Sequence, residues 1–323
     1  MNNITLAICA YNSEKYIEET LNCIVNQTFQ DFDLLIVNDA STDHTKSKIV
    51  SFFKKHQKSY QFVDFELNKG IAFGRKYVLE NVHTEYIIFV DSDDKPNVNL
   101  VEKLYSKIES DADLMAVGCY LEYIDKNGTK IGGGLFLGEK TKERFIHKAE
   151  QKKLIFMQPT AIFKREIALK AGGIKIDGYF DGKPRYQDLC EDLDLWTRMS
   201  DYYVEGKAII VIPEILCQYR KMENTTSTNT IGMMLKMRFV KSNLLSRRNS
   251  KKEQTFVNYF NSISDKDMMK LKKEAKASSL LREGVFSFKN RNLFKAFHKI
   301  TYSVFLHPNY ALQKFKSNIL RQK

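Results

Sequence analysis

Proline and glycine are scarce in this sequence. Its 323 residues include only 5 prolines and 15 glycines, so no stretch has the composition of a long flexible linker. Residues 9–20, which follow the first apolar run, contain no glycine. A dinucleotide-binding fold or a P-loop needs glycines there so that the backbone can approach phosphates. Both classes are therefore excluded, and any nucleotide would have to be held by side chains and a metal ion.

Cysteines and long apolar runs are also few. The five cysteines are odd in number, and none of them has the short spacing of a zinc site. We expect them to be reduced residues of a cytoplasmic protein. The first residues do not have the pattern of a signal peptide, and no apolar run reaches the roughly 20 residues that cross a bilayer. These absences predict a cytoplasmic chain, or one attached peripherally to the inner face of the cell membrane.

Positive charge is concentrated near the C-terminal end. Residues 231–323 hold 21 Lys and Arg against 5 Asp and Glu, a net charge of +16, whereas residues 1–230 have a net charge of −4. This asymmetry predicts one domain over residues 1–225 and a basic, mainly helical region over residues 226–323. It also suggests an anionic partner for the basic region.

The N-terminal part alternates short apolar runs with helical patterns. Strands are predicted at 4–9, 33–38, 61–66 and 86–90, and helices at 42–55 and 71–82. A further helix is predicted after the first strand, with Asn12 or Ser13 as its cap and its apolar face over residues 17–25. Continuously apolar strands separated by helices predict an α/β fold with a mostly parallel central sheet flanked by helices. Further along, a strand over 113–123 is expected to pair with 129–137 through a tight turn. Ligands of parallel sheets bind beyond the carboxyl ends of the strands, so the residues just after each strand are the candidates for a site.

The strongest local signal is the acidic pair Asp91 and Asp93, which directly follows the apolar run 86–90. Two carboxylates at a strand end can face one hard cation, Mg²⁺ or Mn²⁺, together with phosphate oxygens. A solvated acidic turn is the alternative interpretation. Asp39 ends the second strand, where an acid can bind a nucleoside or can cap the helix at 42–55.

Other polar positions have two interpretations each. Glu191 and Asp192 precede an amphipathic helix that carries Trp196, and acids at that place are also what the helix macrodipole favours. Arg75, with Asn68 before it, is either a cation near phosphates or a residue on a helix surface.

Several of these motifs follow one another in an informative order. They occupy residues 7–12, 21–29, 36–43, 68–75, 91–93, 171–173, 191–192 and 196. Their joint order and spacing resemble the family 2 glycosyltransferases with the GT-A fold. The resemblance covers about residues 1–225, with a nucleotide-binding half at about 1–110 and an acceptor half at about 111–225.

The resemblance implies roles for the matching residues. Tyr11 would lie against the nucleotide base, Asp39 would bind the base, and Arg75 would lie near the base or the phosphates. Asp93 would ligate the metal, and Asp91 would join it there or meet the ribose or the metal-bound water. Asp192 would be the catalytic base. The donor-binding residues implied are Ala10, Tyr11, Asn12, Asp39, Asn68, Gly70, Arg75, Asp91 and Ser92, and those on the acceptor side are Glu191 and Trp196.

The implied activity is inverting transfer of a hexosyl or N-acetylhexosaminyl group. The donor would be a UDP-sugar, the cofactor Mn²⁺ or Mg²⁺, and the acceptor a glycan or a lipid-linked hydroxyl in bacterial cell-surface polysaccharide biosynthesis. The sequence departs from the family at Lys76, where Asn is usual, and at Met222, where a His often follows an Arg. Methionine is a poor ligand for a hard cation, and Lys221 or Glu223 are the alternatives. A catalytically silent, nucleotide-binding relative is therefore the alternative function.

The basic region contains an aromatic, amphipathic pattern over residues 285–305. Aromatic and aliphatic side chains there are interleaved with Lys289, Arg291, Lys295 and Lys299. Such a helix suits an anionic membrane surface, which would fit a lipid-linked acceptor, but it also suits a cap packed on the first domain. Binding of nucleic acid would leave the acidic motifs without a purpose, so no nucleic acid is expected. The oligomeric state is not predicted.

Overall fold

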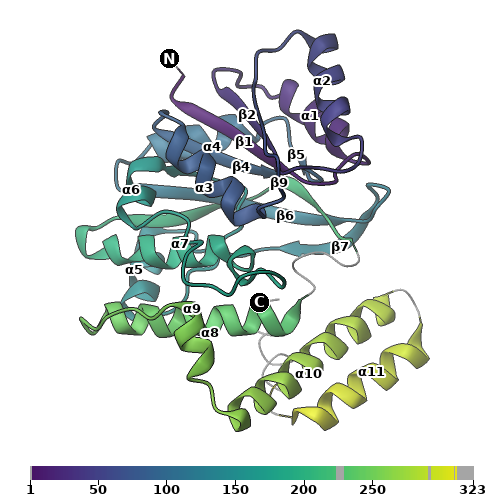
Figure 1. The fold of residues 1–323 in the computed structure, drawn as a ribbon, viewed down its shortest axis with the longest axis vertical. Helices are drawn as coiled ribbons and strands as arrows, with labels where there is room; N and C mark the ends of the chain where they lie inside the picture. The colour runs from purple at the N-terminus through teal and green to yellow at the C-terminus, as the bar shows by residue number, and fades with distance from the viewer. Residues whose placement is uncertain (1, 223–228, 290–291, 309, 311–323) are drawn as a thin grey trace. The chain divides into compact units, whose positions relative to one another are not determined.

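The computed structural model describes residues 2–222, 229–289, 292–308 and 310 (Figure 1). The chain divides into two compact units drawn from interleaved segments. Unit 1 comprises Met1–Asp177, Cys190–Glu223 and Val240–Glu253, and unit 2 comprises Gly178–Leu189, Asn224–Phe239 and Gln254–Lys323. The division at residue 225 stays a prediction. Glu223 and Arg291, as well as the side chains of Phe286 and Lys289, lie outside the described part.

Unit 1 is built on one mixed sheet, which has nine strands within the described residues. Their order is β3-β2-β1-β4-β8-β6-β9-β5, and β7 pairs with β6. The strands are β1 (Ile4–Ala10), β2 (Asp33–Asn38), β3 (Gln61–Asp64), β4 (Tyr86–Asp91), β5 (Lys95–Pro96), β6 (Leu114–Ile124), β7 (Lys130–Leu135), β8 (Ala161–Lys164) and β9 (Ala208–Arg220).

The two halves of the sheet differ in strand direction. Strands β3, β2, β1 and β4 are all parallel, which confirms the prediction for the first half. In the second half β8 is antiparallel to both β4 and β6, and β5 and β7 are antiparallel to their neighbours. Only β6 and β9 are parallel there. The predicted hairpin between β6 and β7 is confirmed, so the sheet is mixed and the expectation of a mostly parallel sheet holds for its first half.

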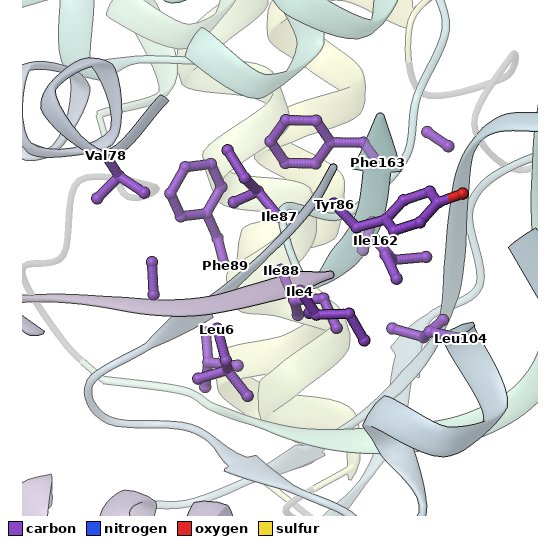
Figure 2. Packing of buried hydrophobic residues seen from close by; sticks show 14 of the residues in the cluster. Ile4, Leu6, Val78, Tyr86, Ile87, Ile88, Phe89, Leu104, Ile162 and Phe163 are labelled. Carbon is purple, nitrogen blue, oxygen red and sulfur yellow. The ribbon is translucent and has the colours of Figure 1, made fainter. Parts of the chain in front are cut away.

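The core of unit 1 lies against the central strands. Successive side chains of a strand point to opposite faces, and on β1 and β4 both sets are almost all apolar and buried, apart from Thr5, Cys9 and Asp91. Figure 2 shows Ile87 and Phe89 of β4 with Phe163 of β8 and Val78 of α3. Burial on both faces is what continuous apolar runs require, because neither face is left for water. All five cysteines are free, as predicted.

Helices connect and follow these strands. In unit 1 they are α1 (Ile17–Val25), α2 (Thr45–His56), α3 (Ile71–Asn81), α4 (Leu100–Glu109), α5 (Lys142–Glu150), α6 (Arg165–Lys170), α7 (Glu191–Met199) and the 3₁₀ turn η2 (Ser200–Glu205). The 3₁₀ turn η1 (Tyr186–Asp188), α9 (Phe256–Asn261), α10 (Asp265–Lys289) and α11 (Leu293–Leu306) belong to unit 2, and α8 (Thr230–Arg247) contributes to both.

Unit 2 is largely helical. Aromatic rings of α9 stack on the segment before α7, with Phe256 lying 5.2 Å from Tyr179 and 4.7 Å from Tyr186. Helices α10 and α11 form an antiparallel hairpin, so the single amphipathic helix expected over 285–305 is wrong: α10 ends at Lys289 and α11 begins at Leu293. No helix in the described part of the chain combines the length and apolar composition that crossing a bilayer requires.

Candidate active site

The register of the parallel strands brings three loops together. Cys9 of β1 lies opposite Asp91 of β4, and Ala10 lies opposite Asn38 of β2. The carboxyl ends of these strands therefore meet at one edge of the sheet. The backbone N–H of Asp39 donates to the carbonyl of Ala10 at 2.8 Å, which ties the first two loops together.

Asn12 and Tyr11 occupy the first of these loops. Asn12 has a φ of 49°, and its side-chain oxygen accepts the backbone N–H of Thr42 at 2.8 Å. Its side chain thus fixes the second loop. Tyr11 has 46% of its surface exposed, so its ring is accessible to a ligand. Buried Ala10 can offer only backbone.

Asp39 organises the loop before α3. Its carboxylate accepts the backbone N–H of Lys69 at 2.7 Å, that of Gly70 at 2.8 Å and the side-chain amide of Asn68 at 2.8 Å. Gly70 has a φ of +93°, a conformation that a side chain disfavours. The structure thus brings Asp39, Asn68 and Gly70 together, and it excludes Asp39 as the cap of α2, since Asp43 accepts the backbone N–H of Thr45 there. Contact of Asp39 with a nucleotide base stays a prediction.

Arg75 is a buried cation between two acids. Its guanidinium donates to Asp91 at 2.7 Å and to Glu191, and it lies 5.3 Å from the centre of the Phe89 ring. Burial lowers the pKa of Arg75, but the charges of Glu191 and Asp91 outweigh burial and raise that pKa above its usual value. The neighbouring Gly74 lets α3 approach β1, because a Cβ there would lie 3.1 Å from the sulfur of Cys9. Arg75 is therefore not a residue of the helix surface.

The acidic turn after β4 is held by hydroxyl groups from the α1 region. The hydroxyls of Ser13 and Ser92 are 2.6 Å apart, and that of Thr20 donates to the carbonyls of Ser92 (3.1 Å) and Asp94 (2.7 Å). The cap predicted for the first helix is wrong because the Ser13 side chain bonds Ser92, and α1 begins only at Ile17.

The carboxyls of this turn crowd one another. Partial burial, and then the charge of Asp91, raise the pKa of Asp93 from 3.8 to about 7. Burial, followed by the charges of Asp91 and Asp93, raises the pKa of Asp94 well above its usual value. One carboxylate oxygen of Asp94 is buried without a hydrogen-bond partner among the described residues. The turn therefore carries negative charge that the surrounding protein does not fully neutralise.

Arg220, which the residue-by-residue reading of the sequence did not single out, clamps this turn from β9. Its side chain is buried and donates to the carbonyl of Asp93 at 2.9 Å and to the Glu19 carboxylate, while its backbone N–H donates to Asp94 at 2.9 Å. It also donates to the carbonyls of the β6–β7 turn. Two signals could have found it: an arginine that ends an apolar strand, and the family pattern in which an arginine precedes the position of Met222.

The two described residues after Arg220, Lys221 and Met222, occupy the place where the family often has a histidine. Met222 is half-buried. The Lys221 ammonium lies 4.5 Å from the centre of the Tyr123 ring and 5.2 Å from that of Tyr219. The substitute for the histidine stays open.

The first turn of α7 supplies the third acid. Asp192 is half-buried next to Glu191, which pairs with Arg75. Burial raises the pKa of Asp192, although the charge of Arg75 and the backbone N–H of Leu193 oppose it. A carboxyl at this place, with a pKa above its ordinary value, is suited to accept a proton near neutral pH.

Trp196 does not lie on the acceptor side as expected. Only 1% of its surface is exposed, and its ring packs edge-to-face on Phe163 at 5.4 Å. The expectation failed because the face of α7 that carries Trp196 packs into the core. Glu191 is likewise buried, and its carboxylate is engaged by Arg75 rather than directed to an acceptor.

The donor set at the turn fits a hard cation. Within the described residues, no group of three or more His, Cys, Asp or Glu side chains is placed to hold a metal ion. Asp91 and Asp93 provide two carboxylates, which leaves further positions for phosphate oxygens and water, the arrangement that Mg²⁺ prefers. The raised pKa of Asp93 is the sign of an unneutralised charge that a cation would relieve.

Comparison with known proteins decides the family. The sequence model of glycosyl transferase family 2 matches residues 5–171. This chain belongs to glycosyl transferase family 2. One similar protein is the putative teichuronic acid biosynthesis glycosyltransferase TuaG of Bacillus subtilis. The two sequences are 27% identical over 221 residues, which cover 68% of this chain and 79% of TuaG. With two other curated relatives the match spans less than a fifth of their length.

Solved structures share its GT-A fold. Residues 1–349 of S. aureus TarS in complex with UDP-GlcNAc align at a TM-score of 0.54 and 20% identity, covering 94% of this chain and 90% of that one. The mannosyltransferase PcManGT from Pyrobaculum calidifontis in complex with GDP-Man and Mn²⁺ aligns at 0.53 and 17% identity, covering 98% and 80%. At such identities the likeness establishes the fold alone, which confirms the predicted fold class.

Proposed function

We propose that this family 2 protein is a metal-dependent, inverting glycosyltransferase. It transfers a hexosyl or N-acetylhexosaminyl group from a UDP-sugar to a hydroxyl of a glycan or lipid-linked acceptor in cell-surface polysaccharide synthesis. The observation that carries the proposal is the placement of Asp91 and Asp192 around Arg75, with Asp93 close to Asp91, at the edge of the sheet where parallel strands bind ligands. A relative with teichuronic acid biosynthesis in its name and a fold neighbour bound to UDP-GlcNAc support the acceptor and donor classes.

The donor would lie across the first two loops. Tyr11 offers an exposed ring for the base, and the loops fixed by Asn12 and Asp39 offer backbone groups. Asp91 and Asp93 would hold the divalent ion, Mn²⁺ or Mg²⁺, and a neighbour of this fold carries Mn²⁺. When bound, that ion neutralises charge on the diphosphate, so the leaving group needs no general acid.

Asp192 would accept the proton of the attacking hydroxyl. Its raised pKa keeps it a stronger base than a solvated carboxylate, and base catalysis of this kind contributes about 10²–10⁴-fold. One base acting on one face of the sugar gives inversion at the anomeric carbon, because a single displacement forms no covalent intermediate. Arg75 orients the assembly, since it joins Asp91 on β4 to Glu191 on α7.

The test uses the full chain with a panel of UDP-sugars and GDP-mannose, with and without Mn²⁺. At ligand concentrations about 100 times Kd, binding stabilises by about 2.7 kcal/mol, so the correct donor should raise Tm by about 4 °C. Slow hydrolysis of the same donor would then show chemistry.

The variant Asp192→Asn separates catalysis from binding. It should lower kcat for hydrolysis or transfer by at least about 10²-fold and keep the donor-induced Tm shift. Equal loss of donor affinity and rate would remove Asp192 from the role of base. A donor-induced shift without any turnover by the unmodified chain would instead identify a catalytically silent nucleotide-binding relative.

A further inference from the structure

Helix α11 carries an exposed apolar stripe, referred to here as the α11 stripe. Its members and their exposed fractions are Leu293 (63%), Phe294 (86%), Phe297 (71%), Val304 (42%) and Phe305 (81%). At 100° per residue they fall within one arc of about 120°, which only Thr301 interrupts. Large apolar side chains exposed together, rather than singly, mark an interaction surface.

The stripe is not the face with which α11 packs on α10. Ala296 and Ser303 are the buried residues of α11, and the Ser303 hydroxyl donates to the carbonyl of Ala277 at 2.7 Å. Gly284 allows close approach there, since a Cβ would lie 2.6 Å from Ile300. The hairpin is therefore packed without using the α11 stripe.

Basic side chains accompany the stripe on the same hairpin. Helix α10 exposes Lys266, Lys270, Lys272, Lys273 and Lys276, and α11 exposes Lys295. Residues 265–306 have a net charge of +6, from 10 basic and 4 acidic side chains. This charge complements an anionic surface, and a surface that also takes up apolar side chains is a lipid bilayer.

We propose that α11 binds in the plane of an anionic bilayer, with the α11 stripe inserted at the boundary between headgroups and acyl chains and the lysines of the hairpin at lipid phosphates. With 14 residues the helix is about 21 Å long, too short to span the hydrocarbon core but sufficient to lie in the interface. This goes beyond sugar transfer, and it rests on the hairpin alone.

The binding test is flotation of the full chain with vesicles. One set contains about 30% phosphatidylglycerol in phosphatidylcholine, and the other contains phosphatidylcholine only. At low salt we expect binding to the anionic vesicles, at least about tenfold weaker binding to the neutral ones, and loss of most binding in roughly 0.5 M salt. No binding to anionic vesicles at low salt, or equal binding to both sets, overturns the proposal.

Two variants separate insertion from simple charge attraction. Phe294→Ser combined with Phe297→Ser should weaken vesicle binding by at least about tenfold, because two apolar side chains no longer enter the bilayer. Val204→Ser, at a valine of unit 1 that is 72% exposed, is the matched control and should bind as the unmodified chain does. Both should keep Tm, since exposed substitutions rarely change stability.

The remaining outcomes are decisive as well. Vesicle binding that survives the double variant would overturn insertion by the stripe. If the double variant changed only the oligomeric mass in light scattering, the stripe would be a contact between two copies of the chain. Hydrolysis of the UDP-sugar without vesicles should be the same in all variants, so failure of this proposal and failure of the proposed enzyme activity are distinguishable.

Discussion

Replacing Asp93 by Asn should stabilise the metal-free protein at pH 8. The folded environment raises the pKa of this carboxyl from 3.8 to about 7, whereas the unfolded chain titrates it near 3.8. Between these values the folded state binds more protons than the unfolded state, so stability without metal falls as pH rises through this window. Because Asn cannot be deprotonated, the Asp93→Asn variant does not lose this stability as pH rises.

The magnitude follows from the size of the change in pKa. At about 1.4 kcal/mol per pH unit, the rise from 3.8 to about 7 corresponds to at most about 4 kcal/mol. Asp93 is partly exposed, and solvent screening reduces the repulsion from Asp91, so we expect about 1–2 kcal/mol. For a chain of this size that corresponds to about 1.5–3 °C in Tm.

The assay is thermal unfolding with a chelator at pH 5 and pH 8, followed by Mn²⁺ addition at pH 8. Asp93→Asn should melt above the unmodified chain at pH 8, the difference should shrink at pH 5, and only the unmodified chain should gain stability with Mn²⁺. Asp64→Asn is a control of opposite sign, because hydrogen bonds from Asn38 and Lys46 lower the pKa of Asp64 and stabilise its charged form. A raised pKa of Asp93 is refuted as the cause if Asp93→Asn melts lower than the unmodified chain at pH 8 without metal, or if its advantage in Tm is the same at both pH values.

Three further substitutions probe the frame and the donor loop. Arg220→Lys loses the guanidinium fork that binds backbone carbonyls of two turns, so the free energy of unfolding should fall by about 2–3 kcal/mol and calorimetry should show at least about tenfold weaker Mn²⁺ binding. Thr20→Val keeps the side-chain shape but removes the hydroxyl that donates to the carbonyls of Ser92 and Asp94, which should cost about 1–3 kcal/mol in denaturant unfolding. Tyr11→Ala should weaken UDP binding about tenfold and leave Tm unchanged, because the ring is exposed; unchanged UDP affinity would place the base elsewhere.

The first half of the fold was predictable because its signals are local. Continuous apolar runs are typical of parallel strands buried on both faces, and the polar residues after each run mark the ligand edge. The second half was not predictable in this way. Strand β8 is confined to Ala161–Lys164 after Pro159 interrupts the apolar run, and β5 has two residues, Lys95–Pro96, with no periodic pattern. The direction of such short strands depends on partners that are distant in the sequence.

The site shows the same division between local and distant information. Asp39, Asp91 and Asp93 stand next to strands, so strand ends predicted their common location. Arg220 reaches the carbonyl of Asp93 across 127 positions of the chain, and no local pattern contains that contact. The prediction that Trp196 lies on the acceptor side was wrong, because an amphipathic pattern shows which residues share a helix face but not how deeply the helix is buried.

Two buried arginines of the site, Arg75 and Arg220, explain why the neighbouring acids Asp91 and Asp93 differ. Arg75 forms an ion pair with the carboxylate of Asp91. The Arg220 side chain instead donates to the backbone carbonyl of Asp93 and forms an ion pair with Glu19. Within the described residues, no basic side chain forms an ion pair with the Asp93 carboxylate. The protein thus neutralises one acid of the pair, fixes the backbone of the other, and leaves that carboxylate under the charge of its neighbour. A divalent ion would gain most from Asp93. For that reason Asp93→Asn should abolish metal-induced stabilisation entirely, while Asp91→Asn, which also leaves Arg75 with only Glu191 to pair, should weaken metal binding and lower the stability of the metal-free fold together.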